Sequence, residues 1–482
     1  MHEPPLHPGR AIPPSRRVPA LARLALAALL LGGVTSATPR QLHTPRDPGG
    51  IRTALAASPH AGACEQCHTS HGEDEPTVYP NALTSPNDNT LCDHCHATAW
   101  AGGSFGGDLL YRGTGHGSST RMVWPGPQPP ARIESDAPTK CLNCHDPHGW
   151  TDALGEIPEL ELLREENTCL TCHDGSPAST DISTEMHKPY RHPTIDYTGR
   201  HTGPGESQPS DFGIAPLNNR HAECEDCHNP HVSRDDGTTP AGNDASKLTL
   251  GVSRVTVLNG AAGAPPLYTF VPASDTLTAP NAEYQLCFKC HSSWTTQPAG
   301  QTDFGLVLNP ANPSFHPVED VGRNPLVSPL AFTAGWSASS LTRCGSCHGS
   351  DFGTLRGPHG STYPNLLRAR SETSPAQSAM TSDELCFSCH AYDVYANPNA
   401  PAMTQSASRF NAPATAGGHA FHVGGQQYPC YSCHVTHGST TQPFLLVTGR
   451  IPGIISFTRS ASGGTCTPTC HGTETYTTNY AH

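Results

Sequence analysis

Apolar residues along this chain occur in short runs, separated by polar stretches rich in Gly and Pro. Within about 246–284, the strings KLTLGVSRVTVLNG and PLYTFVP alternate apolar and polar residues, which predicts a hairpin or small sheet. The string FLLVTGRIPGIISF at 444–457 predicts a second hairpin. Elsewhere, the 46 Gly and 48 Pro residues oppose long helices and wide sheets. We therefore predict a mostly irregular fold with short helices and one or two small β-hairpins.

The N-terminal segment predicts export. Four arginines accompany the apolar run Leu24 to Leu31, and the small residues Thr35-Ser36-Ala37 follow it. This order is typical of a secretory signal peptide, which we assign to residues 1–37. The alternative is an uncleaved anchor, but the run is shorter than the roughly 20 residues that span a bilayer. We expect an exported protein without a membrane span, in the periplasm or at the extracellular surface.

Composition and charge narrow the class of protein. Hydrophobic residues make up 35% of the chain, below the roughly 45–50% apolar share of ordinary domains. Removal of residues 1–37, with four Arg and one Glu, changes the formal net charge from −13 to −16. This charge disfavours nucleic-acid binding, which uses a basic face, and suits cationic partners or metal ions.

Cysteine and histidine carry the candidate chemistry. All 20 cysteines fall into ten motifs that end in histidine, nine of the form C-x-x-C-H and the last, CTPTCH, with one extra residue. The cysteines are Cys64, Cys67, Cys92, Cys95, Cys141, Cys144, Cys169, Cys172, Cys224, Cys227, Cys287, Cys290, Cys344, Cys347, Cys386, Cys389, Cys430, Cys433, Cys466 and Cys470. The closing histidines are His68, His96, His145, His173, His228, His291, His348, His390, His434 and His471.

C-x-x-C-H is the attachment signal for c-type haem. The two thiols add across the vinyl groups of the haem, and the histidine becomes the proximal ligand of the iron. With no cysteine left over, the chain is predicted to hold about ten covalently attached haem c groups, which would form the core that its low apolar content does not supply. With its altered spacing, the tenth motif is the least certain attachment site.

The motifs form five pairs that resemble one another, which indicates a repeat architecture. The first motif of a pair is followed by a polar stretch and a further histidine, as in CEQCHTSHG, CLNCHDPHG, CEDCHNPHV and CYSCHVTHG. The second motif usually follows an apolar residue, as in LCDHCH, LCFKCH and LCFSCH. We place the haem pairs in repeats one to five at 38–105, 106–200, 201–315, 316–415 and 416–482, with the predicted β insertion in repeat three.

Each haem iron needs a second, distal ligand. His71, His148, His231 and His437 lie three residues after a closing histidine, and His359 follows an insertion in repeat four. Three residues span at most about 10 Å, too little to reach around the macrocycle to the other face of the same iron. We expect these five histidines to ligate neighbouring haems, within their own pair. The alternative is a hydrogen bond to a haem propionate, or simple exposure.

A second set of histidines precedes the five pairs. Its members are His60, His116, His192, His316 and His422. Four of them, together with His482, fit the preceding pairs equally well, and His419 competes with His422. We interpret His43, His187, His201 and His221 as surplus, and His94, inside a motif, as a non-ligand.

The sequence C-x-x-C-H-x-x-H followed by L-C-x-x-C-H resembles the doubled-CxxCH family of multihaem c-type cytochromes, here as a decahaem member. The resemblance extends over nearly all of the chain after residue 37. It implies electron transfer outside the cytoplasm, through closely packed haems with mainly two histidine ligands. Relatives include periplasmic carriers, parts of outer-membrane conduits and subunits of extracellular filaments.

The leading interpretation is an electron-transfer protein and not an enzyme. Its partners would be redox proteins as donor and acceptor, extracellular metal oxides, or copies of itself in a filament, with no nucleic acid. The alternative is a multihaem reductase of nitrite, hydroxylamine or a sulfur oxyanion, which needs one haem with an open coordination position. A third hypothesis, zinc bound by Cys and His side chains, requires ten attachment signals to be coincidental.

Overall fold

The computed structural model describes residues 60, 64–69, 82–85, 89–96, 115–118, 141–149, 151–152, 155–157, 161, 163, 166–176, 178–195, 221–273, 281–295, 297–298, 300–324, 327–351, 357–410 and 418–477. All of these belong to one unit of the chain, Pro48–His482. The predicted signal peptide and His71 lie outside the described residues. No described helix is long and apolar enough to cross a membrane.

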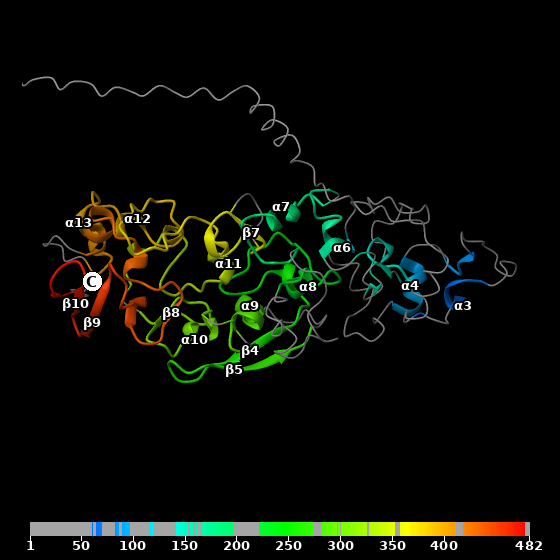
Figure 1. Ribbon diagram of the computed structural model, residues 1–482, viewed down its shortest axis with the longest axis horizontal. Coiled ribbons are helices and arrows are strands. Elements are labelled where there is room, and N and C mark those ends of the chain that lie inside the picture. Colours follow the sequence, from blue (N-terminus) through cyan, green and yellow to red (C-terminus); the bar gives the residue numbers. More distant parts are fainter. Residues whose placement is uncertain are drawn as a thin grey trace, which may run out of the picture. The chain divides into compact units, whose positions relative to one another are not determined.

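Short helical turns joined by irregular segments make up most of the fold (Figure 1). Nine turns carry attachment motifs: α3 (Cys64–Cys67), α4 (Asn89–His96), η3 (Cys141–Asn143), α6 (Glu166–Leu170), α8 (Cys224–Cys227), α9 (Glu283–His291), α11 (Cys344–Cys347), η10 (Leu385–Ser388) and η12 (Cys430–Ser432). The others are α7 (Ile182–Met186), η7 (Lys247–Thr249), α10 (Phe304–Leu308), η8 (Pro329–Ala331), η9 (Pro364–Leu366), α12 (Tyr392–Tyr395), α13 (Ala402–Ser406), η11 (Ala420–Gly425) and η13 (Pro443–Leu445).

The strands are short and form only small antiparallel sheets. They are β1 (Thr151–Asp152), β2 (Gly155–Glu156), β3 (Tyr190–Arg191), β4 (Arg254–Leu258), β5 (Leu267–Val271), β6 (Ser314–Phe315), β7 (Gly360–Ser361), β8 (Gly438–Ser439), β9 (Ile454–Ser460), β10 (Gly463–Pro468) and β11 (Glu474–Thr477). The pairs are β1–β2, β3–β7, β4–β5 and β6–β8, and β9–β10–β11 forms a three-stranded sheet. The prediction of a mostly irregular fold with short helices and small sheets is confirmed.

The predicted hairpin in repeat three is confirmed. Strands β4 and β5 pair in register from Arg254↔Val271 to Leu258↔Leu267. The inner face of this hairpin packs on α9, where Val255 and Phe288 are fully buried together with Leu308 and Val318. This cluster is the largest described apolar core. The insertion therefore contributes apolar side chains to a packed core beside α9.

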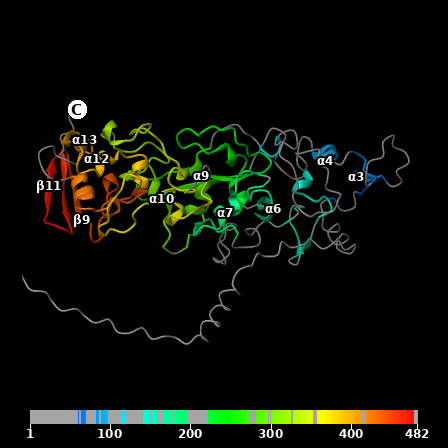
Figure 2. The same ribbon diagram turned by 90° about the horizontal axis from the view of Figure 1, so that it is seen from above.

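The predicted hairpin at 444–457 is wrong. Residues from Pro443 form the turn η13, and β9 begins only at Ile454, pairing with β10. Phe444 and Leu445 both have positive φ angles, 60° and 57°, which are incompatible with a strand. Figures 1 and 2 show the C-terminal sheet beside α12 and α13, and the rings of Phe410 and Tyr476 contact each other at 4.9 Å.

Candidate cofactor-binding sites

The attachment motifs share one local structure. In seven of them, the N–H of the closing histidine donates to the carbonyl of the first cysteine at 2.8–3.0 Å, as in a single helical turn. Residues i, i+3 and i+4 lie on one face of such a turn, so C-x-x-C-H presents both thiols and the imidazole together. The tenth motif differs, because Cys466 lies in strand β10.

Each of the ten closing histidines lies opposite one other histidine ring. The pairs are His68–His148, His96–His60, His145–His231, His173–His116, His228–His359, His291–His192, His348–His437, His390–His316, His434–His419 and His471–His422. Their ring centroids are 5.9–6.5 Å apart. Two metal–imidazole bonds of about 2 Å each, plus the distances from nitrogen to ring centre, add up to about 6 Å. Each gap therefore matches one metal ion held between two imidazoles.

The first set of candidates faces the preceding repeat. His148 of repeat two lies opposite His68 of repeat one, and His437 of repeat five lies opposite His348 of repeat four. His231 and His359 follow the same rule. The prediction that these rings would serve their own pair is therefore wrong. In repeats two, three and five, the three-residue link after the first motif directs its histidine away from that motif and towards the repeat before it.

The second set faces the pair that follows it in the chain. His60, His116, His192 and His316 lie opposite the second motif of repeats one, two, three and four. The sequence had left this choice open between the preceding and the following pair. Each of the first four motif pairs thus receives one ring from before its first motif and one from the next repeat.

Repeat five receives both opposing rings from a single π-helical turn. His419, which directly precedes η11, faces His434. His422, which lies within η11, faces His471. His419 was only a competitor of His422 in the sequence, although the spacing H-x-x-H in GGHAFHVGG was a visible signal. In repeats one to four, the ring opposite the first motif comes from the following repeat. In repeat five, the turn supplies this ring as His419.

Hydrogen bonds orient the second set of rings in a repeated way. Nδ1 of His60, His116 and His192 donates to the carbonyl of Pro147, Pro230 and Pro358, at 3.2, 3.1 and 2.6 Å. His316 makes the same bond with Thr436. Every acceptor directly precedes a histidine of the first set, so we call these four contacts the clamp bonds. A proton held at Nδ1 leaves Nε2 free to bind a metal.

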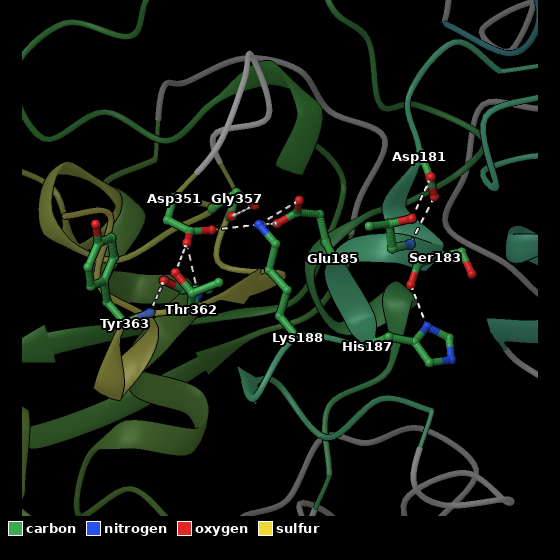
Figure 3. Close-up of polar contacts among 12 residues, drawn as sticks. Asp181, Ser183, Glu185, His187, Lys188, Asp351, Gly357, Thr362 and Tyr363 are labelled. Carbon is green, nitrogen blue, oxygen red and sulfur yellow. Dashed lines mark hydrogen bonds and ion pairs between the residues drawn. The ribbon is translucent and has the colours of Figure 1, made fainter. Parts of the chain in front are cut away.

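Short strand pairs and a charged cluster support these clamp bonds. In β3–β7, Arg191↔Gly360 brings His192 next to His359, and in β6–β8 the N–H of His316 donates to the carbonyl of His437 at 2.8 Å. Near β3, the Nζ of Lys188 lies 2.8 Å from Glu185 and 2.5 Å from Asp351 (Figure 3). Asp351 also accepts from the N–H of Thr362, at 2.9 Å. The cluster therefore ties residues 185–188 to repeat four beside both ligand rings.

In repeats four and five, the closing histidine of the first motif is oriented by a turn with left-handed residues. Nδ1 of His348 and His434 donates to the carbonyls of Asn365 and Phe444, at 2.8 and 3.0 Å. Both acceptors have φ of 60°, in the left-handed region that costs non-glycine residues energy. Each follows a proline, and the turn shares the pattern P-x-L-L (PNLL and PFLL). The sequence contained this pattern, but only the structure shows its carbonyl directed at a ligand ring.

Burial keeps these rings neutral. It lowers the pKa of His359, His419 and His437 to about 3, and the pKa of His173, His231 and His390 to about 4. Neighbouring histidines lower them further. Neutral imidazole is the form that binds a metal, so most of these rings are available as ligands at neutral pH.

The thiols of successive motifs lie close together in chain order. Between repeats, hydrogen-bonded thiols join Cys169 with Cys224, Cys287 with Cys344, and Cys386 with Cys430. Within repeats, charge repulsion from the second motif helps to raise the pKa of Cys227 and of Cys347 to about 12, after burial as the main cause. Neighbouring attachment sites from repeat two to repeat five are therefore adjacent.

A continuous cavity of about 3480 Å³ runs along these motifs. Eight of the ten ring pairs line it, from His145–His231 to His471–His422. A cavity for one small ligand measures about 300–1,000 Å³, so this space suits several large groups in series. Paired thiols, opposed neutral imidazoles and a continuous cavity together fit a row of covalently attached haems.

The remaining described histidines have other contacts. His94 and His187 donate to the carbonyls of Thr90 and Ser183 within their own turns, and His221 lies 3.4 Å from Glu223. The buried Met380 contacts the motif residue Cys430 at 3.6 Å through its sulfur. His43, His201 and His482 lie outside the described residues. Among the described residues, no group of three or more His, Cys, Asp or Glu side chains is arranged to hold a metal ion.

Comparison with known proteins supports the assignment of the motifs. Residues 339–394, which contain both motifs of repeat four, match the Doubled CXXCH motif family. This doubled motif implies covalently bound haem c and is typical of multihaem c-type cytochromes. No protein of curated function and no solved structure shows significant similarity to the chain.

Proposed function

We propose that this protein is a decahaem c-type cytochrome that carries electrons along ten bis-histidine haems. The observation that carries the proposal is the set of ten ring pairs, in which every closing histidine has its own opposing histidine at 5.9–6.5 Å. Chance contacts between surplus histidines would not supply one partner to each of ten motifs.

The chain's residues would act in three ways. Each cysteine adds its S–H across a haem vinyl group, so that sulfur bonds to one vinyl carbon and hydrogen to the other. Each ring pair would supply two imidazole nitrogens to one haem iron, and the bound haem would supply the iron that accepts the electron. The polypeptide would set the spacing of the irons, as expected of a protein that positions a cofactor.

The geometry favours electron transfer over catalysis. A multihaem reductase needs an iron with an open position for its substrate. The tenth motif was the best candidate for such a site, yet His471 lies opposite His422 at 6.2 Å. We therefore rank the reductase of nitrite, hydroxylamine or a sulfur oxyanion second.

Donor and acceptor would be other redox carriers outside the cytoplasm. A chain of adjacent sites could pass electrons between two proteins, to an extracellular metal oxide, or to another copy in a filament. The net charge of −16 after removal of residues 1–37 favours a cationic partner or a metal surface. Export follows from the signal-peptide pattern, since c-type haem is attached after the chain has crossed the membrane.

The first test is haem content together with low-temperature EPR of the oxidised protein. We expect about ten covalent haems per chain, all low-spin, because two imidazoles produce a strong ligand field. A high-spin signal of about one haem in ten would indicate an open site and favour the reductase. Purified protein without covalent haem would contradict the proposal and favour zinc.

A further inference from the structure

The two rings of each pair meet at angles that alternate along the chain. At the first motifs of repeats one to four, the ring planes are nearly parallel, at 22°, 9°, 17° and 9°. At the second motifs of the same repeats they are crossed, at 77°, 64°, 58° and 61°. Four repeats with different sequences and insertions thus show the same alternation.

Repeat five provides an internal comparison. Its first site has parallel rings at 22°, as in the other repeats, but its second site is also near-parallel at 27°. The opposing ring there, His422, donates its Nδ1 to Gly418 within its own turn, at 2.8 Å. In all four crossed sites, Nδ1 of the opposing ring instead makes a clamp bond to another repeat. Crossed rings therefore occur together with the clamp bond.

Ring orientation matters to iron because imidazole π orbitals interact with the two metal d orbitals, dxz and dyz, whose lobes point between the axial ligands and the porphyrin plane. Parallel rings interact with one of two such orbitals and separate their energies. Crossed rings interact with both and leave them nearly equal. The unpaired electron of low-spin ferric iron occupies this set, so the two arrangements differ in magnetic anisotropy and in the stability of the oxidised form.

We infer that the ten sites are of two electronic classes, with crossed ligands at the second sites of repeats one to four and parallel ligands at the other six, and that the clamp bonds create the difference. This inference rests on the proposed function, since it concerns rings that bind haem iron. Parallel ligands stabilise ferric iron by separating the two orbitals. Other influences being equal, reduction potentials then alternate between higher at crossed sites and lower at parallel sites.

The test is low-temperature EPR of the oxidised full-length holoprotein, with spins quantified against covalent haem. Crossed ligands give a highly anisotropic signal with one very large g value, and parallel ligands give an ordinary rhombic signal. We expect about four haems in the first signal and about six in the second.

Two matched variants in one repeat assign the signals. His316→Ala removes a ring from a crossed site of repeat four and should lower the highly anisotropic signal by about a quarter. His437→Ala removes a ring from the parallel site of the same repeat and should lower the rhombic signal by about a sixth. Each should add about one high-spin haem.

The outcomes separate this inference from the proposed function. Ten low-spin haems with a single type of signal would overturn the two classes and leave the cytochrome proposal intact. Loss of rhombic signal in His316→Ala would also overturn the class assignment. Protein without covalent haem would instead overturn the proposed function.

Discussion

Burial favours the uncharged form of single ionisable side chains, and it does so outside the histidine ring pairs as well as within them. Glu319 follows the His316 segment and contacts the β insertion, where its carboxylate accepts from the Asn259 amide at 2.7 Å. Burial raises its pKa to about 7, while the Asn259 hydrogen bond acts in the opposite direction. The carboxyl also helps to raise the pKa of Tyr268 and Tyr284, which face it from the insertion.

This raised pKa predicts a loss of stability at alkaline pH. The folded protein holds a proton between pH 4.5 and about 7 that the unfolded chain has released. The contribution of Glu319 to stability is therefore complete below pH 4.5 and is lost as the pH rises through 7. Glu319→Gln should be more stable than the wild type at pH 8, by on the order of 2 kcal/mol, and nearly equal at pH 4.5.

Denaturant unfolding of the holoprotein at the two pH values, followed by haem absorbance, measures this difference. The neighbouring Asp320→Asn is the control, because it makes the same change from acid to amide at an exposed position. A stability difference in Glu319→Gln that does not change with pH would contradict the assigned pKa.

Individual ligands differ in how far the sequence predicts them. The closing histidines follow from C-x-x-C-H, whose chemistry is contained in five consecutive residues. An opposing ring depends on a tertiary contact, such as that between His437 and His348, 89 residues apart. Spacing excludes the motif's own iron but does not say which neighbour is reached. His419 was considered only as a competitor of His422, because one histidine before each pair had sufficed in the other repeats.

Glycine follows most histidines of the first set. The two-residue strand pairs β3–β7 and β6–β8 show why. A Cβ built on Gly438 would lie 1.8 Å from the carbonyl oxygen of Val307, and one on Gly360 would lie 1.8 Å from that of Glu185. Val232 occupies this position in repeat three, and Gly251 makes room opposite it, since a Cβ there would lie 2.1 Å from the Val232 side chain. The close approach holds the adjacent ligand ring in place.

Gly438→Ala should therefore displace His437 from His348. We expect about one haem in ten to become high-spin by EPR, together with a stability loss of about 1–3 kcal/mol from overpacking. Gly322→Ala is the matched control, because nothing lies within 4 Å of the added Cβ. An unchanged low-spin spectrum for Gly438→Ala would show that β8 does not position this ring.

The Lys188 cluster connects elements of repeats two and four. The side chains of Lys188, Glu185 and Asp351 are 14%, 6% and 6% exposed. Although burial favours a neutral Asp351, hydrogen bonds from Lys188 and Thr362 lower its pKa to about 2. Removal of the lysine would leave two carboxylates close together and poorly solvated.

Lys188→Met should therefore destabilise the protein at pH 7 by about 2–3 kcal/mol, measured by denaturant unfolding of the holoprotein. Lys247→Met, which removes the partner of Asp236, is the control. That pair is 45% and 33% exposed, so little change is expected. Equal effects of the two substitutions would show that the cluster acts as an ordinary surface ion pair.

Element boundaries were predictable where local chemistry decides them. The β4–β5 hairpin follows from alternation, and the motif turns follow from the i, i+3, i+4 arrangement. The failure at 444–457 has a local reason: apolar residues of PFLL turn through left-handed conformations to present a carbonyl to His434. Hydropathy does not distinguish such a turn from a strand, because the ring that it serves comes from another part of the chain.

At the scale of the whole molecule, small apolar clusters surround a cavity much larger than any of them. The described buried clusters centre on Val255 and Phe288, on Phe387 and Met380, and on Val394. The low apolar content of the sequence predicted that side chains alone would not fill the interior. The adjacent sites follow the order of the motifs along the chain, but the exchange of ligands between repeats required three-dimensional information.

That exchange bears on how such a chain could change in length. Each of the first four repeats provides motifs for two irons, takes one ring from the segment before them, and borrows the other from its successor. If a whole repeat were duplicated in register, the copy would give one histidine ring to the repeat before it. It would receive one histidine ring from the repeat after it. No iron would be orphaned, because the H-x-x-H turn would still close the series. Under the proposed function, the electron path would thus lengthen or shorten by two irons at a time without passing through a defective intermediate.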